Sequence, residues 1–416
     1  MKVLFVGFAV PDATMEEISQ RDQFPQIAAH NFQWSIIRGV EDASKSTMDL
    51  VSSIPVSDYP RYPRIFFGHR KWRHRDGARD VLMPFVNVIL IKHLSRLFSS
   101  IALISAWLLR NRKFGSRSIL VYAFHSPHVL AALMALRIFG GKAILILPDL
   151  PAYSDTGSHR GLIRRTAKAL DILWMPWMIR KFDGLVVVSK HIAEDLDIGD
   201  VQYIVVDNAI PAHQLEDDGD GVVPLPGAGD GEIIVMYAGG LMEEYGVRLL
   251  LDAFALIPEE NYRLWICGKG AMESEVRERS LRDPRIVYWG FLPNKDVMEK
   301  ERQSTVLVNA RPSDMVFTRY SCPIKVLEFM LSARPTITTA LPGISEEYNE
   351  YLYFLGEETP DNLAELIRSV CSKPPKELSE FGRRASEFVR REKSYRKQGM
   401  RIHDFVFRIA GQSERG

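Results

Sequence analysis

The sequence predicts an α/β protein with two doubly wound parallel sheets. Short apolar, β-rich runs alternate with segments of helical period, which is the pattern of parallel sheets covered by helices on both faces. The length of 416 residues fits two large domains. A stretch rich in Asp, Gly and Pro divides the strand-like runs into two series, and each series is expected to form one sheet.

The first domain is expected to span residues 1–213. Its predicted strands are residues 3–7, 119–123, 143–147, 184–188 and 203–206, and its clearest helix is residues 129–139. The long apolar stretch 81–109 is interrupted by Lys92, His93 and Arg96. It is therefore interpreted as one or two buried helices rather than a membrane span.

The second domain is expected to span residues 231–385, after a linker at 214–230 that lacks the apolar groups to pack a core. Its predicted strands are residues 233–238, 262–267, 285–288, 306–309 and 336–339, and its helices are residues 248–256, 325–332 and 361–371. Residues 386–416 are expected to form a C-terminal helix that packs back on the first domain.

Composition excludes several classes of protein. The hydrophobic fraction of 46% and charged fraction of 25% are those of a folded protein, and 53 Lys and Arg nearly balance 52 Asp and Glu. Three widely separated cysteines predict neither a disulfide framework nor structural zinc, and fit a reducing cytoplasm. No GxGxxG follows the first strand and no GxxxxGK[ST] occurs, which argues against a dehydrogenase and a P-loop ATPase.

Small residues follow three successive strands of the second domain. They are the pair Gly239-Gly240, the turn 267–270 (Cys-Gly-Lys-Gly) and the pair Gly290-Phe291. Glycines let a phosphate approach the backbone, and a following helix N-terminus favours an anion. A single turn of this kind is as well explained by plain chain reversal, but three along one rim favour a phosphate-binding edge.

The segment 320–330, YSCPIKVLEFM, carries the most specific pattern. Lys325 and Glu328 are three residues apart and share a helix face, with Ser321 as a candidate cap. A cation early in a helix opposes the macrodipole, so Lys325 is interpreted as holding a phosphate. Glu328, one turn later, can accept hydrogen bonds from both hydroxyls of a ribose. The alternative is an ordinary surface ion pair.

These residues resemble the pattern of glycosyltransferase family 4, in its bacterial exopolysaccharide and capsule branch. The resemblance rests on YAGGL at 237–241, ICGKG at 266–270, GFLP at 290–293 and the segment 320–330. It covers most of the second domain and is weaker in the first. It implies the GT-B fold, in which two Rossmann-like domains face a cleft, and a retaining sugar transfer from a UDP-type or GDP-type nucleotide-sugar without a metal. The first domain would bind a saccharide or lipid-linked acceptor.

The resemblance also implies roles for single residues. Glu328 matches the ribose-binding Glu, Lys325 and Gly239-Gly240 would face the diphosphate, and Gly290-Phe291 would lie by the base. The sequence departs from the pattern where Tyr320 replaces an acid and where Gly240 and Tyr245 replace two cations. The further candidates for matching phosphate charge are Lys269, Arg311, Arg248 and Arg319.

Two residues of the first domain are candidates for catalysis. Asp149 follows the strand 143–147, where the family often has a His, and an acid there can stabilise positive charge on a sugar or orient an acceptor hydroxyl. His125 follows the strand 119–123 and can bond the sugar or the diphosphate. The alternatives are a helix cap for Asp149 and a packed turn histidine for His125.

Charge is uneven along the first domain. Residues 51–181 hold 21 Lys and Arg against 6 Asp and Glu, and residues 160–181 are basic and then Trp-rich. Basic flanks around Trp174 and Trp177 favour reversible contact with an anionic membrane on its cytoplasmic side. The alternative is a solvated basic face with core tryptophans. No nucleic-acid-binding module accompanies the charge.

Two other functions remain compatible with the sequence. One is a GT-B nucleotide-sugar epimerase, which needs no acceptor. The other is a catalytically silent protein that binds a nucleotide-sugar and regulates an assembly complex, and Tyr320 in the position of an acid keeps this alternative open.

Overall fold

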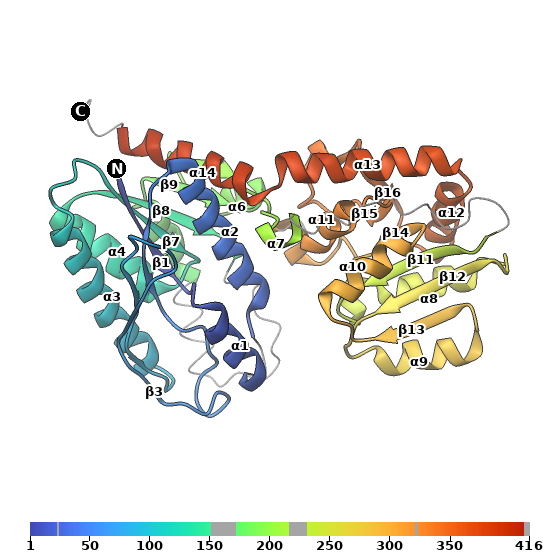
Figure 1. Cartoon of the computed structure of the whole chain (residues 1–416), viewed down its shortest axis with the longest axis horizontal. Coiled ribbons are helices and arrows are strands. Elements are labelled where there is room, and N and C mark those ends of the chain that lie inside the picture. Colours follow the sequence, from blue (N-terminus) through green and yellow to red (C-terminus); the bar gives the residue numbers. More distant parts are fainter. Residues whose placement is uncertain (23–24, 151–171, 216–230, 321–322, 412–416) are drawn as a thin grey trace. The chain divides into compact units, whose positions relative to one another are not determined.

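The computed structural model describes residues 1–22, 25–150, 172–215, 231–320 and 323–411. The chain folds into two compact units (Figure 1). Unit 1 comprises residues 1–212 and 394–416, and unit 2 comprises residues 213–393.

Unit 1 is built on an eight-stranded sheet that is parallel except at one edge. The strand order is β10 (Gln202–Val205), β9 (Gly184–Val187), β8 (Lys142–Leu147), β7 (Arg117–Tyr122), β1 (Lys2–Gly7), β2 (Asp49–Ser52), β5 (Asp80–Leu82) and β4 (Arg70–Trp72). Among the described strands of this sheet, β4 alone runs antiparallel to its neighbour. A separate two-stranded ribbon joins β3 (Phe66–Phe67) to β6 (Phe85–Val86).

Helices cover both faces of this sheet because successive side chains of a strand point to opposite faces. The described helices of unit 1 include α1 (Asp12–Arg21), α2 (Ile27–Ser44), α3 (Ile91–Arg110), α4 (Ser126–Phe139), α6 (Lys190–Asp195) and α14 (Tyr395–Gly411), and residues 172–179 are also helical. Val3 and Phe5 of β1 belong to a core cluster with residues of α2 and α14. Figure 1 shows α3 and α4 side by side on the other face, where the alternate residues Leu4 and Val6 are also fully buried.

Unit 2 is built on a six-stranded, wholly parallel sheet. The strand order is β13 (Ile286–Gly290), β12 (Tyr262–Cys267), β11 (Ile233–Ala238), β14 (Val306–Asn309), β15 (Thr336–Thr339) and β16 (Tyr353–Leu355). Its helical segments are α7 (Ala212–Leu215), η1 (Glu243–Tyr245), α8 (Val247–Ala255), α9 (Glu273–Arg282), α10 (Asn294–Gln303), η2 (Val316–Tyr320), α11 (Ile324–Leu331), η3 (Glu346–Tyr348), α12 (Pro360–Cys371) and α13 (Pro375–Glu392).

The strand orders locate the candidate binding edges. In unit 2 the chain proceeds outward from β11 to β13 on one side and from β14 to β16 on the other. The order therefore reverses between β11 and β14, and ligands of doubly wound sheets bind beyond the carboxyl ends of strands at such a point. In unit 1 the corresponding reversal lies between β1 and β7.

Several predicted elements need correction. The stretch 81–109 forms part of β5, all of β6 and most of α3, and α3 is not buried on all sides. The short strands β2 and β16 were not predicted, because three or four residues carry too little periodicity.

The expected domain boundaries differ from the compact units at two places. The expected linker begins inside α7, whose Gln214 is buried; its residues 216–230 lie outside the described part. The expected boundary at 385 falls inside α13, which stays with unit 2 as far as Glu392 because its buried face packs against α11. Residues 395–411 form α14, which packs on α2.

Three further predictions concern surfaces and cysteines. Trp174 and Trp177 are both more than half exposed, so neither is a core tryptophan. No helix in the described parts of the chain is both long enough and apolar enough to cross a membrane. Cys267 and Cys371 are buried free thiols, and Cys322 lies outside the described residues.

Candidate active site

The three glycine turns of unit 2 form one continuous edge. The Gly239 amide donates to Cys267 O at 3.0 Å, and the Gly268 amide donates to Gly290 O at 2.8 Å. These bonds join the loops that follow β11, β12 and β13. The structure therefore brings together Gly239, Gly240, Lys269, Gly290 and Phe291, which the sequence predicted to share one rim.

Two glycines of this edge are required by close backbone approach. A Cβ on Gly268, whose φ is +145°, would lie 1.8 Å from Gly239 O. A Cβ on Gly246, whose φ is +79°, would lie 1.8 Å from Ala310 O. A side chain at either position would separate the loop after β11 from its neighbours. The two glycines therefore hold the loops of this edge close together.

Lys269 and Phe291 form a pair on the exposed side of this edge. The Lys269 ammonium lies 4.7 Å from the centre of the Phe291 ring, and the ring itself is 69% exposed. A cation over an aromatic face is attracted by the ring quadrupole. An exposed ring of this kind offers a flat surface on which a nucleotide base can stack.

Lys325 and Glu328 form an ion pair on α11. Lys325 Nζ lies 2.8 Å from Glu328 Oε2, and both side chains are partly buried. Gln214 Nε2 donates to Glu328 Oε1 at 3.0 Å, and Gln214 Oε1 is buried with no hydrogen-bond partner in the described structure. The Lys325–Glu328 contact is expected both for a donor-binding site and for an ordinary ion pair. The hydrogen bond from Gln214 was not predicted from the sequence and is known only from the structure.

A buried acid, Glu301 of α10, completes this cluster. Its side chain lines a small hollow together with Gln214, Lys325 and Glu328. Burial raises the pKa of Glu301 to about 8, with Glu328 adding to the effect and Lys325 opposing it. Burial also acts to lower the pKa of Lys325, but the charges of Glu328 and Glu301 raise it overall. Near neutral pH, Glu301 is therefore mainly protonated and Lys325 is charged.

The remaining cationic candidates occupy different surroundings. The Arg311 guanidinium, which follows β14, lies 4.5 Å from the ring centre of Tyr245, so it belongs to the same edge as the glycine turns. Arg248 is instead paired with Glu243 at 3.0 Å and Glu275 at 2.8 Å. The expectation that Arg248 helps to match phosphate charge stays a prediction; in this arrangement its charge is matched by two carboxylates.

The segment that leads into α11 is described only in part. Ser321 lies outside the described residues, so its predicted capping and donor-binding roles stay predictions. Tyr320, in the position where an acid was expected, is 8% exposed. The helix begins at Ile324 with Pro323 as the preceding residue, and such a proline fits the first turn of a helix.

In unit 1, Asp149 lies just past the carboxyl end of β8 and is exposed. Its charge acts on Tyr122, the last residue of the neighbouring strand β7. Burial raises the pKa of the Tyr122 hydroxyl, and the charge of Asp149 raises it further. The structure therefore places Asp149 at the carboxyl edge of the sheet.

His125 precedes α4 and lies within a largely buried group of basic and aromatic side chains. Its ring packs 4.5 Å from that of His128 and 5.2 Å from that of Phe8. Its Nε2 is 3.4 Å from Arg96 Nη1. Burial lowers the pKa of His125 well below 6.5, and the electrostatic effects of His128 and Arg96 lower it further. His125 is therefore a neutral imidazole at neutral pH.

The cations around His125 are themselves unusual. Burial lowers the pKa of Arg96 to about 9, with Asp58 opposing the shift, and lowers that of Lys92 to about 8. Burial also lowers the pKa of His128 to about 3. The sequence revealed Lys92 and Arg96 only as interruptions of an apolar run. Within the described residues, no group of three or more His, Cys, Asp or Glu side chains could hold a metal ion.

Several solved structures share the architecture of this chain. The chain is similar to a sucrose-phosphate synthase from Thermosynechococcus elongatus, with 13% identity, a TM-score of 0.64, and coverage of 99% of this chain and 100% of that one. It is similar to the lipopolysaccharide outer core galactosyltransferase WaaB, with 16% identity, a TM-score of 0.62 and full coverage of both chains. Anabaena HepE in complex with UDP-glucose shares 12% identity, a TM-score of 0.56, and coverage of 98% and 100%. These likenesses confirm the GT-B fold of two Rossmann-like domains.

The family of unit 2 follows from the sequence itself. Residues 232–373 match the family model described as glycosyl transferases group 1. The chain thus carries a group 1 glycosyltransferase domain, and the protein is a glycosyltransferase. A comparison with curated proteins gave no match. The predicted family is confirmed, and its exopolysaccharide branch stays a prediction.

Proposed function

We propose that the protein is a retaining glycosyltransferase of polysaccharide or glycolipid assembly. In this proposal it transfers a sugar from a UDP-type or GDP-type nucleotide-sugar to a saccharide or lipid-linked acceptor at the cytoplasmic face of the membrane. The group 1 glycosyltransferase domain of unit 2 supports transfer from a nucleotide-sugar. The complex of the structurally similar HepE with UDP-glucose supports a UDP-type donor.

One observation carries the donor part of the proposal. Glu328 and Lys325 lie one helical turn apart in an ion pair, and a second polar group, Gln214, fixes the Glu328 carboxylate. A carboxylate held in this way is ready to accept hydrogen bonds from the two hydroxyls of a ribose. In the proposal, the diphosphate takes the place of Glu328 as the partner of the Lys325 ammonium. Lys269, Arg311 and the Gly239-Gly240 turn supply further phosphate contacts.

Asp149 and His125 have different proposed roles in the transfer. As the bond between the anomeric carbon and the diphosphate breaks, positive charge develops on that carbon, and a carboxylate can stabilise it. Asp149, exposed at the end of β8, is the proposed source of that charge. His125 is neutral and therefore acts as a hydrogen-bonding group for the sugar or the diphosphate rather than as an acid.

The decisive experiment begins with donor identity. Thermal-shift measurements against UDP-, GDP- and ADP-sugars should show stabilisation by one nucleotide class, because a ligand that binds only the folded state raises its stability. Transfer to a saccharide or lipid-linked acceptor is then measured with the stabilising donor. Failure of every nucleotide-sugar to stabilise the protein would contradict the proposed donor site.

A second candidate function is a silent nucleotide-sugar-binding regulator. It is favoured by Tyr320 in the place of an acid and by Arg248, whose charge is already matched by two carboxylates. Hydrolysis of the donor by the purified protein would argue against a silent regulator. Incubation with the nucleotide-sugar alone separates both functions from an epimerase, because only an epimerase would convert the sugar without an acceptor.

A further inference from the structure

The N-terminal half of helix α3 of unit 1 is amphipathic in the reverse sense, whereas the C-terminal half buries Ile104, Trp107 and Leu108 in the usual way. The buried side of the N-terminal half holds the charged residues Lys92 and Arg96, which are 5% and 4% exposed, and also Ser100. Its exposed side holds Leu94 at 56% and Phe98 at 67% exposed. We call this exposed side the α3 face, and its members are Ile91, Leu94, Phe98, Ala102, Ala106 and Leu109. A helix facing water normally shows the opposite arrangement.

Specific bonds fix α3 in this orientation. Lys92 Nζ donates to Val56 O at 2.6 Å and to Asp58 Oδ1 at 2.8 Å. Arg96 Nη2 donates to Ile54 O at 3.0 Å, and its guanidinium lies 4.4 Å from the ring centre of Phe85. Rotating α3 to bury its apolar side would break these bonds and leave both cations without their partners. The apolar face is therefore held outward by the fold.

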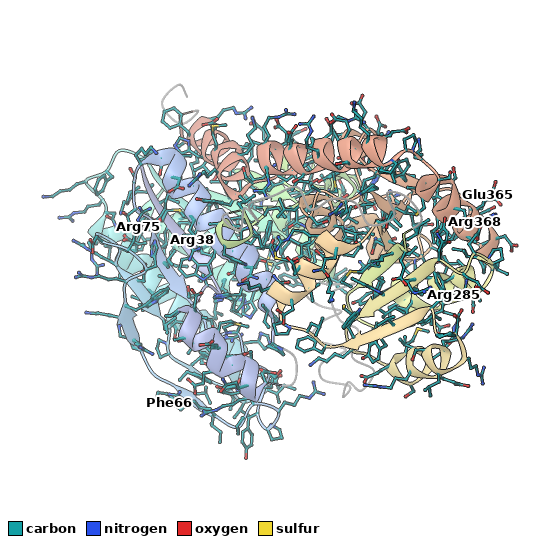
Figure 2. The ribbon with its side chains drawn as sticks, turned by 45° about the vertical axis from the view of Figure 1, so that its right-hand side comes forward. Arg38, Phe66, Arg75, Arg285, Glu365 and Arg368 are labelled. Carbon is teal, nitrogen blue, oxygen red and sulfur yellow. The ribbon has the colours of Figure 1, made fainter. Side chains whose placement is uncertain are left out.

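The apolar surface continues beyond α3. Leu90 precedes the helix, and Ile65 and Phe66 lie beside it on the β3–β6 ribbon, all three exposed. The Asn87 amide donates to Ile65 O at 2.6 Å, which ties the ribbon to the start of α3. Figure 2 shows Phe66 at the outer edge of unit 1. Helix α4, which packs along α3, adds the exposed Met134 and Ile138.

The charge around this surface is of one sign. Residues 81–148 contain eight Lys and Arg and no Asp or Glu. Arg110, Arg112 and Lys113 are exposed at the C-terminal end of α3, and Arg61 and Arg64 are exposed on the segment next to its N-terminal end. Two copies of this chain joined symmetrically through the α3 face would bring these cations together, which costs energy. A partner with a negatively charged surface above an apolar layer matches both the apolar side chains of the α3 face and the cations around it.

We propose that the α3 face, with the adjoining residues of the β3–β6 ribbon, is a docking surface for an anionic lipid membrane. The apolar side chains enter the boundary between headgroups and acyl chains, and the cations at both ends of α3 lie among the headgroups. This surface does not include Trp174 and Trp177, which carry the sequence-based membrane prediction. The proposal does not depend on the transfer reaction, because membrane binding is measured without donor or acceptor.

The test uses the full chain and vesicles of phosphatidylcholine with and without phosphatidylglycerol. We expect sedimentation with phosphatidylglycerol vesicles that weakens as salt rises. Leu94→Gln combined with Phe98→Gln should reduce the partition coefficient at least tenfold, because two large apolar side chains no longer enter the lipid. Arg112→Gln combined with Lys113→Gln should reduce it about fivefold for each charge removed.

Two matched variants and two outcomes make the test decisive. Leu281→Gln, at an isolated and highly exposed leucine of α9, should leave vesicle binding unchanged. Trp174→Ala combined with Trp177→Ala should bind more strongly than the α3 variant. Circular dichroism and nucleotide binding check that each variant is folded. Unchanged vesicle binding by the α3 variant would overturn the proposal. A lack of vesicle binding by the unaltered protein would also overturn the proposal. If light scattering then showed a dimer that the α3 variant dissociates, the α3 face would be an interface between two copies of the chain instead.

Discussion

The candidate site of unit 2 and the carboxyl edge of the unit 1 sheet bury ionisable groups of opposite kinds. In unit 2 the buried group with the raised pKa is an acid, Glu301. In unit 1 the buried groups with lowered pKa values are bases, among them His125, His128 and Arg96. Burial disfavours the charged form in both places. It therefore raises the pKa of the acid and lowers the pKa values of the bases. The two units should respond to pH in opposite directions.

The two regions also differ in what their polar groups contact. In unit 2, Lys325 and Glu328 compensate each other's charge at 2.8 Å, and the exposed Phe291 and Lys269 lie on the outer side of the same edge. In unit 1, the polar atoms of Lys92 and Arg96 are bound to backbone carbonyls of the fold itself. Unit 2 thus offers groups that a ligand can engage, while in unit 1 the exposed Asp149 is the better candidate for direct contact with a substrate.

The largest expected effect concerns Glu301. Its folded-state pKa of about 8 lies above the ordinary value of 4.5, so the unfolded chain releases this proton first as pH rises. Stability of unit 2 should therefore fall between pH 4.5 and 7 by about 3 kcal/mol from this group. Glu301→Gln, which cannot ionise, should flatten that dependence. Hydrogen exchange of unit 2 peptides at several pH values measures it, and an equal slope in the variant would contradict the assignment.

Asp149→Asn tests the edge of unit 1 directly. The substitution keeps the shape and removes the charge, so turnover should fall about 100-fold or more, with nucleotide affinity nearly unchanged. Turnover and calorimetric nucleotide binding are measured on the same variant. If Asp149 were only a helix cap, activity would stay near normal, because Asn caps a helix about as well as Asp. That result would leave His125 as the candidate.

Glu328→Ala tests the edge of unit 2. Loss of a charge-assisted hydrogen bond should weaken nucleotide binding by about 1.5–3 kcal/mol. Gln214→Ala is the matched control, because it leaves the carboxylate in place but removes the side chain that fixes it, and a smaller loss is expected. Calorimetry with the stabilising nucleotide gives both values. Unchanged nucleotide affinity in a folded Glu328→Ala variant would indicate that the Lys325–Glu328 contact is an ordinary surface ion pair.

His128 provides a smaller effect than Glu301, and the effect has the opposite sign. Its folded-state pKa of about 3 lies below the ordinary value of 6.5, so the unfolded chain binds a proton that the folded chain does not. Stability of unit 1 should fall by about 2 kcal/mol from this group as pH decreases from 7 to 5. His128→Asn should reduce that loss. Acid-induced exchange of unit 1 peptides that is the same in both proteins would exclude His128 as its source.

The sequence was sufficient for most of the parallel strands and for the glycine turns of unit 2, because both depend on residues close together in the chain. A run such as 262–267 has the length and apolar character of a buried strand wherever it lies. Gly268 and Gly270 mark a tight turn in the sequence, although the contacts that require them, with Gly239 O and Leu241 O, are made between loops. Lys325 and Glu328 share a helix face by spacing alone, and their contact at 2.8 Å follows from it.

The tertiary structure decided which groups surround those residues. Gln214 and Glu301 reach the Lys325–Glu328 pair from positions 114 and 27 residues away from Glu328 in the sequence, and no local pattern encodes such a contact. The sequence of α3 shows apolar residues and cations in alternation, but it does not show which side is covered. Carbonyls of residues 54 and 56 bind the two cations, and because that binding faces them inward, it leaves Leu94 and Phe98 outside.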